Sequence, residues 1–256
     1  MKILVVVAMT KEADPIIKKL DMCLSNIQLP ENLRAPVYFK LYDQHEVYLV
    51  LSGKDKVHNT DLLGSGIIPS VTLAIHIIKP SLIINIGSAG GFSQRGAKKH
   101  EIYLSDGEFR FHDRLFGPDV YHTPYGVGSY PVFDGVDELA NKLNLKRARV
   151  STGGSMLSSR EEEEQMKKNG AVLKEMEAAH VAQVATLFNV PVLAIKGVSD
   201  LVDITDCPQQ QFADSIHSLS EKLAEVLCNV LKALPQKNRL QYDSIEEKHN
   251  FFRARL

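Results

Sequence analysis

Cysteine is scarce in this sequence, and the motifs that bind metals are missing. The 256 residues include only three cysteines, Cys23, Cys207 and Cys228, which are widely spaced and form no CxxC pair. This usage is typical of a reduced protein, and we therefore expect a cytoplasmic location. Nine histidines are scattered without an HExxH or comparable ligand spacing, so we expect no zinc and no other bound metal.

Signatures of cofactors and of polyanionic partners are missing too. The chain contains neither a GxGxxG segment nor a GxxxxGKS or GxxxxGKT segment, which removes the usual signs of dinucleotide and triphosphate binding. We therefore expect no cofactor. The formal net charge is −1, which gives no reason to expect a nucleic acid or an anionic membrane as a partner.

No hydrophobic run in the sequence is long enough to cross a membrane. The N-terminus passes directly from Met1 and Lys2 into the apolar run Ile3–Val7 and then into charged residues, without a small-residue cleavage site. We interpret this run as a first strand and not as a signal peptide, and we expect no association with a membrane.

The sequence has the composition of an ordinary globular protein, 44% hydrophobic and 24% charged, which is enough to bury one sizeable core. Strand-like and helix-like segments alternate without an internal repeat or a linker. This alternation predicts an α/β fold, a single three-layer α/β/α domain with a central mixed sheet. We place the domain at residues 1–234. The polar residues 235–256 form a tail that is either disordered or docked locally, and Phe251 and Phe252 favour docking.

Hydrophobic patterning predicts most elements of this domain. Thr10 can cap a helix that ends at Leu20, and Ser159 with Glu162 fits a capping box. The segment Val172–Phe188 is either one long helix or a strand that turns into a helix near Glu175. The other predicted strands are Val37–Tyr42, Val47–Leu51, Ser81–Ile86 (broken at Gly87), Ile102–Leu104 and Arg149–Ser151, and the other predicted helices are Ile67–Ile78 and Phe212–Leu234.

Asp200 stands at the end of the apolar run Val190–Val198. Such a run suits a strand covered on both faces, and open α/β sheets bind ligands where these strands end. At the edge of a low-dielectric core the protonated carboxyl is favoured, so Asp200 could act as an acid near neutral pH. The alternative is an N-cap for the following helix. We interpret Asp203 as a cap or turn residue.

Three more candidates each have a structural alternative. Glu12 follows the first strand closely, but an acid in the first turn of a helix also complements the helix dipole. The small residues of Gly87–Gly91 could let a ligand approach the backbone, or could form a tight turn with glycines at positive φ. Glu177 could hold vicinal hydroxyls, because one carboxylate accepts two hydrogen bonds, or could mark an exposed helix start.

Taken together and in this order, these segments resemble the nucleoside phosphorylase and hydrolase superfamily, and within it the 5′-methylthioadenosine/S-adenosylhomocysteine nucleosidases. Tyr125–Gly128 and Lys174 look closer to the plant-type members. The resemblance implies a nucleoside phosphorylase-like fold. The segments that carry it are Val6–Ala13, Lys79–Phe92, Phe111–Arg114, Ser151–Gly153, Glu175–Ala178 and Val198–Asp203.

The resemblance also implies roles for individual residues. Asp200 would protonate the purine at N7, and Glu12 would orient and deprotonate the attacking water. Glu177 would grip the ribose 2′- and 3′-hydroxyls, with Met176 packed on the sugar. Ser88 would steady Asp200. The remaining residues implied to contact the substrate are Met9, Ala89, Gly90, Lys174, Glu175, Ser199 and Phe212, and Lys196 is expected to serve Glu12 or the water.

Two segments depart from the family pattern. Met156 stands where an aromatic side chain often stacks on adenine, and Leu157 where backbone groups read the base edge. A methionine thioether can pack favourably against the face of a purine. Gln209–Gln211 occupies the region that normally helps to build the alkylthio pocket, so Phe212 is the apolar residue that remains there. The choice between a methylthio and a homocysteinyl substituent therefore stays open.

The predicted function is hydrolysis of 5′-methylthioadenosine to adenine and the thioribose in methionine salvage, with S-adenosylhomocysteine as a further substrate left open. Related phosphorylases carry a glycine-rich, arginine-bearing loop after the first strand, where this chain has Ala8–Glu12. The alternatives are another purine nucleoside hydrolase or phosphorylase, or a non-catalytic nucleoside-binding or storage protein. The resemblance also implies a homodimer whose partner closes the thio end, with Phe109–Tyr125 as the expected source. The alternative for this stretch is an ordinary surface loop with its own small core.

Overall fold

The computed structural model describes residues 1–114, 128–204 and 207–235. The polar tail at 236–256, with its pair of phenylalanines, lies outside the described residues. So do residues 115–127, which include most of the aromatic segment from which a partner contact was expected. Phe109 and Phe111 are described, and both are fully buried in the core of this chain. They are therefore not available to close a partner's site, which corrects that part of the prediction.

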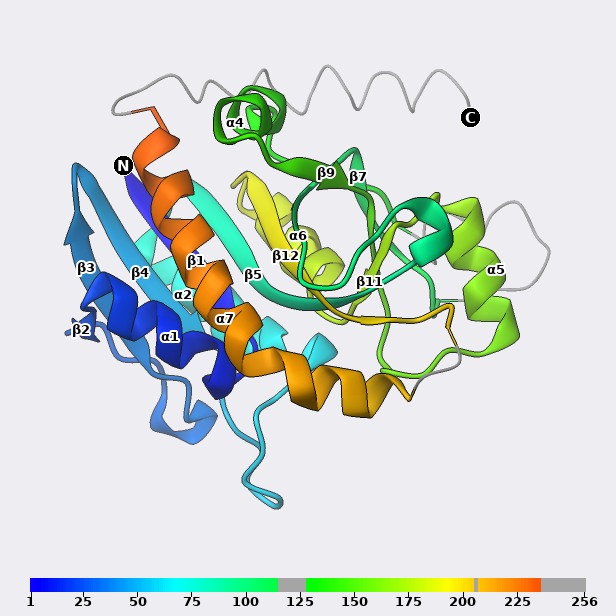
Figure 1. Ribbon diagram of the computed structural model, residues 1–256. Coiled ribbons are helices and arrows are strands. Elements are labelled where there is room, and N and C mark those ends of the chain that lie inside the picture. The colour runs from blue at the N-terminus through cyan, green and yellow to red at the C-terminus, as the bar shows by residue number, and fades with distance from the viewer. Residues whose placement is uncertain (115–127, 205–206, 236–256) are drawn as a thin grey trace, which may run out of the picture.

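A mixed sheet forms the centre of the molecule (Figure 1). Strand β5 (Leu82–Gly91) is its hub, because it pairs in parallel with β1 (Lys2–Val7) and with β12 (Val192–Leu201), and its end pairs antiparallel with β11 (Leu173–Glu175). Strand β4 (His45–Leu51) runs parallel to β1 on the other side. The remaining described strands are β2 (Cys23–Leu24), β3 (Val37–Tyr42), β6 (Ile102–Ser105), β7 (Glu108–Phe111), β8 (Tyr130–Pro131), β9 (Lys146–Ala148) and β10 (Val150–Thr152).

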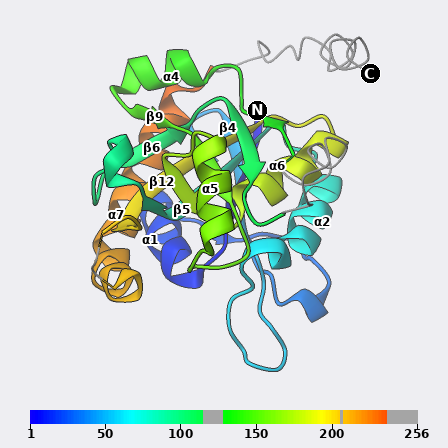
Figure 2. The same cartoon turned by 90° about the vertical axis from the view of Figure 1, so that its right-hand side faces the viewer.

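Helices cover both faces of the sheet (Figures 1 and 2). Helices α1 (Thr10–Leu20) and α7 (Pro208–Ala233) pack together on one face, and α2 (Ile68–Ile78) and α6 (Ala178–Leu187) pack together on the other. Because water is excluded from both sides, β1 and β12 are buried along nearly their whole length and do not alternate between buried and exposed residues. The single-domain, three-layer prediction is therefore confirmed.

The smaller helices complete the fold. Helix α4 (Val136–Leu143) packs on α7, and α5 (Arg160–Lys168) begins at the capping box formed by Ser159 and Glu162, as predicted. The described short 3-10 turns are η1 (Glu31–Leu33), η2 (Gly64–Ile67) and η3 (Ser93–Arg95).

Two local predictions were wrong for long-range reasons. Thr10 is the first residue of α1 and not its cap, since the Asp61 carboxylate accepts from both the backbone N–H and the hydroxyl of Thr10. The glycines after Ile86 do not break the strand, because β5 continues to Gly91. Of the two alternatives for 172–188, the structure has the strand that turns into a helix.

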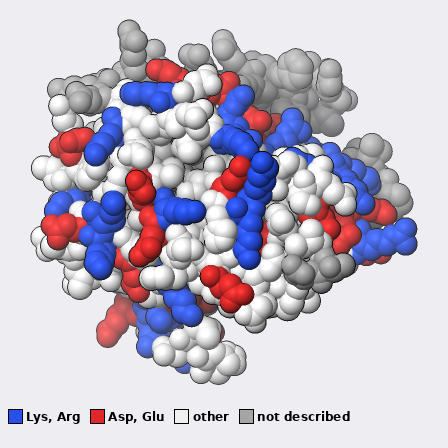
Figure 3. All heavy atoms as spheres, viewed as in Figure 1, with Lys and Arg blue, Asp and Glu red and all other residues white. Residues whose placement is uncertain are grey.

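The surface carries charged side chains of both signs. On the face shown in Figure 3, basic and acidic side chains are interspersed. No described helix combines the length and apolarity that a membrane crossing requires. Within the described residues, no group of three or more histidine, cysteine, aspartate or glutamate side chains could hold a metal ion. Cys23 and Cys207 are exposed and Cys228 is buried, and all three are free thiols.

Candidate active site

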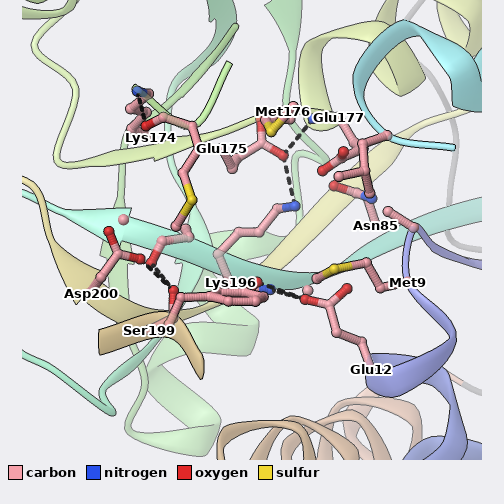
Figure 4. Close-up of a pocket in the computed structure, with 18 of the residues that line it drawn as sticks. Met9, Glu12, Asn85, Lys174, Glu175, Met176, Glu177, Lys196, Ser199 and Asp200 are labelled. Atoms are coloured by element: carbon pink, nitrogen blue, oxygen red, sulfur yellow. Dashed lines mark hydrogen bonds and ion pairs between the residues drawn. The ribbon is translucent and has the colours of Figure 1, made fainter. Parts of the chain in front are cut away.

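A cavity of about 200 Å³ lies where β1, β5 and β12 end and where α1 and α6 begin (Figure 4). This space exceeds what a single water needs, so it can hold a ligand. The structure brings most of the sequence-predicted site residues to this cavity. Those that line it are Met9, Glu12, Ser88, Ala89, Gly90, Met156, Lys174, Glu175, Met176, Glu177, Ser199, Asp200 and Phe212.

Glu12 is in the first turn of α1, as the dipole alternative required, but its carboxylate points inward and only 3% of the residue is exposed. Its Oε1 accepts hydrogen bonds from both the backbone N–H and the hydroxyl of Ser88, each 2.7 Å long. Gly87 makes room for this carboxylate, since a Cβ there would lie 3.1 Å from Oε2. Burial raises the pKa of Glu12, and the Ser88 hydrogen bonds and the charge of Lys196 oppose the rise.

Asp200 is the second buried acid of the cavity, at 4% exposed. It lies within β12 after a register shift against β5, and the next helix begins only at Pro208, so the N-cap alternative is wrong. The hydroxyl of Ser199 donates to its Oδ1 at 2.6 Å. Burial raises the pKa of Asp200, and the Ser199 hydrogen bond and the charge of Lys174 oppose this.

Ser88 does not have its expected partner. Ser88 was predicted to steady Asp200, but it holds Glu12, and Ser199 holds Asp200. The small residue beside Asp200 is Gly90, where a Cβ would lie 3.1 Å from Oδ2. Glu12 and Asp200 therefore each have one oxygen held by a serine and a glycine beside the other oxygen.

Glu177 is the third acid, at the N-cap position of α6. It is 8% exposed, which excludes the alternative of an exposed helix start. Its Oε1 accepts from the backbone N–H of Gly64, 2.8 Å away, on a turn where φ is +58°. Burial and the neighbouring charge of Glu175 raise the pKa of Glu177 to about 7.

Glu175 and Lys196 form a buried ion pair behind these acids, with 2.7 Å between Oε2 and Nζ. Glu175 also accepts from the Thr152 hydroxyl and from the backbone N–H groups of Glu177 and Ala178. Burial opposes its ionisation, but the Lys196 charge and these hydrogen bonds lower the pKa of Glu175 below its ordinary value. Although Glu175 lines the cavity, its oxygens are occupied by protein donors, and Lys196 pairs with Glu175 and not directly with Glu12.

Lys174 fixes the loop that carries Met156. Its Nζ donates to the Met156 carbonyl at 2.7 Å and to the Ser158 hydroxyl at 2.5 Å. Met156 consequently lines the cavity at its rim, 36% exposed. Leu157 does not line it and is 62% exposed, which corrects its predicted place at the base edge.

Sequence reasoning left some lining residues out of the predicted site. Asn85 could have been noticed as the polar residue in the apolar run before Gly87, whereas Leu63 and Val202 carry no signal that separates them from ordinary core residues. The lining residues that were not predicted to contact the substrate are Ala8, Leu63, Asn85, Ile86, Gly87, Ser155, Lys196 and Val202. Of these, Gly87 belongs to a candidate segment, and Lys196 was expected to serve Glu12 or the water. Asp203, outside the cavity lining, accepts from the backbone N–H groups of Ser93 and Gln94 and thus acts as a cap, as predicted.

Known proteins resemble this chain over most of its length. Residues 2–233 match the family described as the phosphorylase superfamily. A 5′-methylthioadenosine/S-adenosylhomocysteine nucleosidase of Arabidopsis thaliana is 37% identical over 237 residues, which cover 92% of each chain. A 5′-methylthioadenosine nucleosidase of the same plant is 32% identical, over 91% of this chain and 87% of that protein.

Solved structures agree with these sequence matches. The apo structure of Arabidopsis thaliana 5′-methylthioadenosine nucleosidase has a TM-score of 0.88 and 31% identity, and the match covers 93% of this chain and 97% of that one. A crystal structure of an MTA/SAH nucleosidase has a TM-score of 0.86 at 36% identity, covering 90% and 94%. The chain belongs to the phosphorylase superfamily and, within it, to the family of the 5′-methylthioadenosine/S-adenosylhomocysteine nucleosidases.

Proposed function

We propose that this protein is an N-glycosidic hydrolase that cleaves 5′-methylthioadenosine into adenine and 5-methylthioribose, a step of methionine salvage. The observation that carries the proposal is the meeting of Glu12, Asp200 and Glu177 at one cavity, although they come from three separate elements. The names of the similar Arabidopsis proteins support the same substrate.

Asp200 is the general acid for the leaving base. Its buried position favours the protonated carboxyl, and with Oδ1 held by Ser199, Oδ2 can face the purine across Gly90. Transfer of this proton to N7 lets adenine depart as a neutral molecule. A positioned acid of this kind typically contributes about 10²- to 10⁴-fold in rate.

Glu177 and Glu12 act on the sugar side. Glu177 has one oxygen directed by Gly64, and its carboxylate can accept the 2′- and 3′-hydroxyl protons of the ribose. The sugar becomes positively charged as the bond to adenine breaks, so ionised carboxylates beside it stabilise the transition state. Glu12, held by Ser88, takes the proton of the attacking water.

The charge balance favours water over phosphate as the nucleophile. The basic residues lining the cavity in the described part of the chain are Lys174 and Lys196, and Lys196 is neutralised by Glu175 at 2.7 Å. Lys174 is engaged by the Met156 carbonyl. A phosphate dianion would meet the carboxylates of Glu12 and Glu177, and this repulsion disfavours phosphorolysis.

We also propose a homodimer located in the cytoplasm, a catalytic domain at 1–234 and a separate tail at 235–256. The free cysteines support the compartment, and the family resemblance supports the dimer. Sedimentation of the full chain tests the dimer, and a chain ended after Leu234 tests the tail.

The deciding experiment measures adenine release from 5′-methylthioadenosine and from S-adenosylhomocysteine, each with and without inorganic phosphate. We expect release from 5′-methylthioadenosine that does not depend on phosphate. Release that requires phosphate would replace the hydrolase with a phosphorylase. Binding of the nucleoside without release would leave a storage or binding protein.

A further inference from the structure

Asn85 has an unexplained oxygen. It lies on β5, lines the cavity and is 1% exposed. Its Nδ2 donates to the Val6 carbonyl at 3.4 Å, which fixes the orientation of the amide, because a carbonyl oxygen can only accept. The remaining atom, Oδ1, is buried without a hydrogen-bond partner in the described structure. Such an acceptor costs about 1 to 3 kcal/mol, unless a ligand donates to it.

The strand register places Asn85 beside the nucleophile end of the cavity. Asn85 and Gly87 are two residues apart on β5 and therefore face the same side, and Lys196 is paired with Gly87. Glu12 faces the same spot, because its carboxylate occupies the space that a Gly87 side chain would fill. In Figure 4, Asn85 lies near Glu177 and Met9 and far from Asp200.

The proposed reaction supplies a limited number of hydrogen-bond donors at the nucleophile end of the cavity. The two ribose hydroxyls carry one proton each, and the Glu177 carboxylate accepts both. The attacking water carries two protons, one of which goes to Glu12. The second water proton needs an acceptor, and Asn85 Oδ1 is the buried acceptor on that side without a partner.

We propose that Asn85 is a positioning residue for the hydrolytic water, an assignment that rests on the proposed function. The water donates to Glu12 and to Asn85 Oδ1, and this pair of hydrogen bonds directs a lone pair at C1′. In the reaction the water oxygen bonds to C1′ and one water proton moves to Glu12. The C1′–N9 bond breaks, its electron pair leaves with adenine, and Asp200 donates a proton to N7.

Methanol separates this role from a structural one. Methanol has a single O–H, which Glu12 accepts, so its attack on C1′ does not use a second acceptor. It yields the methyl glycoside of 5-methylthioribose by the same bond changes, with the hydroxyl proton passing to Glu12. Loss of Asn85 Oδ1 should therefore slow attack by water more than attack by methanol.

The test compares Asn85→Leu with the wild-type protein in buffer containing a fixed fraction of methanol. We expect hydrolytic kcat to fall about 5-fold, the value of one hydrogen bond, and the ratio of methyl glycoside to free sugar to rise by a similar factor. KM should stay within about 2-fold of the wild-type value, because Asn85 does not contact the nucleoside in this role. Its loss should therefore change the binding free energy of the nucleoside by less than one hydrogen bond contributes.

Asn169→Leu is the matched control. Asn169 is also buried, but it donates to the Phe111 carbonyl and the Ser151 hydroxyl and does not line the cavity. We expect it to lower the melting temperature and leave the product ratio unchanged. Asn85→Ala, which removes atoms and adds none, is measured alongside in case the leucine variant does not fold, and the same direction is expected.

An unchanged kcat and product ratio in both Asn85 variants would overturn the assignment. So would a raised KM with an unchanged ratio, which would place the amide on a ribose hydroxyl. If wild type does not accept methanol, a fall in kcat at constant KM still supports the proposal, and a change in KM alone overturns it. Failure of the proposed function is a separate result, because wild type itself would then release no adenine.

Discussion

Burial alone would neutralise each carboxylic acid in this cavity, and the neighbours of each acid decide which of them ionises. Glu175 stays charged because Lys196 is 2.7 Å away. Glu177 lacks such a partner, and burial with the Glu175 charge raises its pKa to about 7. Asp200 also has a raised pKa. The cavity thus contains two kinds of acid. Glu175 is held ionised in an ion pair that fixes the geometry, whereas Glu177 and Asp200 can exchange protons.

At the residue scale, the pH dependence follows from these directions. In the proposed mechanism the ribose is bound by ionised Glu177, so kcat/KM for 5′-methylthioadenosine should rise as the pH increases through about 7. In the same mechanism the proton comes from protonated Asp200, whose pKa is raised by burial, so the rate should fall as the pH rises through the pKa of Asp200. Glu175→Gln removes a negative charge beside Glu177, and it should move the acid limb to lower pH. The measurement is the pH profile of kcat/KM for both proteins.

An acid limb that stays in place in Glu175→Gln would show that another group produces it. Because this variant leaves Lys196 buried without its partner, its folding is checked first by circular dichroism.

At the scale of elements, β5 supplies the geometry through its glycines. Gly87 gives space to the Glu12 carboxylate, whereas a Cβ on Gly91 would lie 2.7 Å from the Ala97 Cβ and 2.9 Å from the Val198 side chain. Neither glycine has a positive φ, so alanine is tolerated by the backbone at both positions. The two glycines therefore separate an effect on the site from an effect on the core.

We expect Gly87→Ala to displace the Glu12 carboxylate by a few tenths of an ångström. It should lower kcat by about 10-fold, because a full 1 Å shift of a catalytic group can cost about 100-fold. Its melting temperature should change little. Gly91→Ala is the control in the same strand, and there we expect a lower melting temperature. Kinetics and thermal melts of both variants provide the check, and full activity in Gly87→Ala would show that Glu12 needs no such space.

The sequence predicted elements better than the contacts between them. Mostly apolar runs located β1, β5 and β12, because a strand covered on both faces carries few polar residues before it ends. The glycines at 87–91 were misread as a break, since glycine more often ends a strand than admits a neighbouring carboxylate. The Asp61 cap of Thr10 and the pairing of Glu175 with Lys196 join residues far apart in the chain, and no local pattern encodes them.

At the scale of the whole molecule, the burial of acidic groups in the cavity lowers the stability of the folded state. The pKa of Glu177 is above its ordinary value of 4.5, so the folded state binds this proton more tightly than the unfolded chain. The stabilising contribution is complete at pH values below 4.5 and is lost as the pH rises to about 7. Above that pH the folded protein carries a buried charge without a direct ion-pair partner.

Glu177→Gln should therefore stabilise the substrate-free protein at pH 8 relative to wild type, and should have little effect at pH 5. The expected gain at pH 8 is on the order of 3 kcal/mol, from a pKa shift of about two and a half units. Urea unfolding at the two pH values measures it. Equal effects at both pH values would mean that Glu177 titrates alike in the folded and unfolded states.

In the proposed reaction, Asp200 carries the proton that adenine takes when it leaves. Turnover of 5′-methylthioadenosine by Asp200→Asn, measured beside the binding affinity of the same variant, tests it most directly. Asparagine keeps the size of the side chain and cannot supply the proton, so we predict a loss of kcat of about 10³-fold, with affinity nearly unchanged. Turnover close to that of the wild-type protein would show that another group protonates the leaving base.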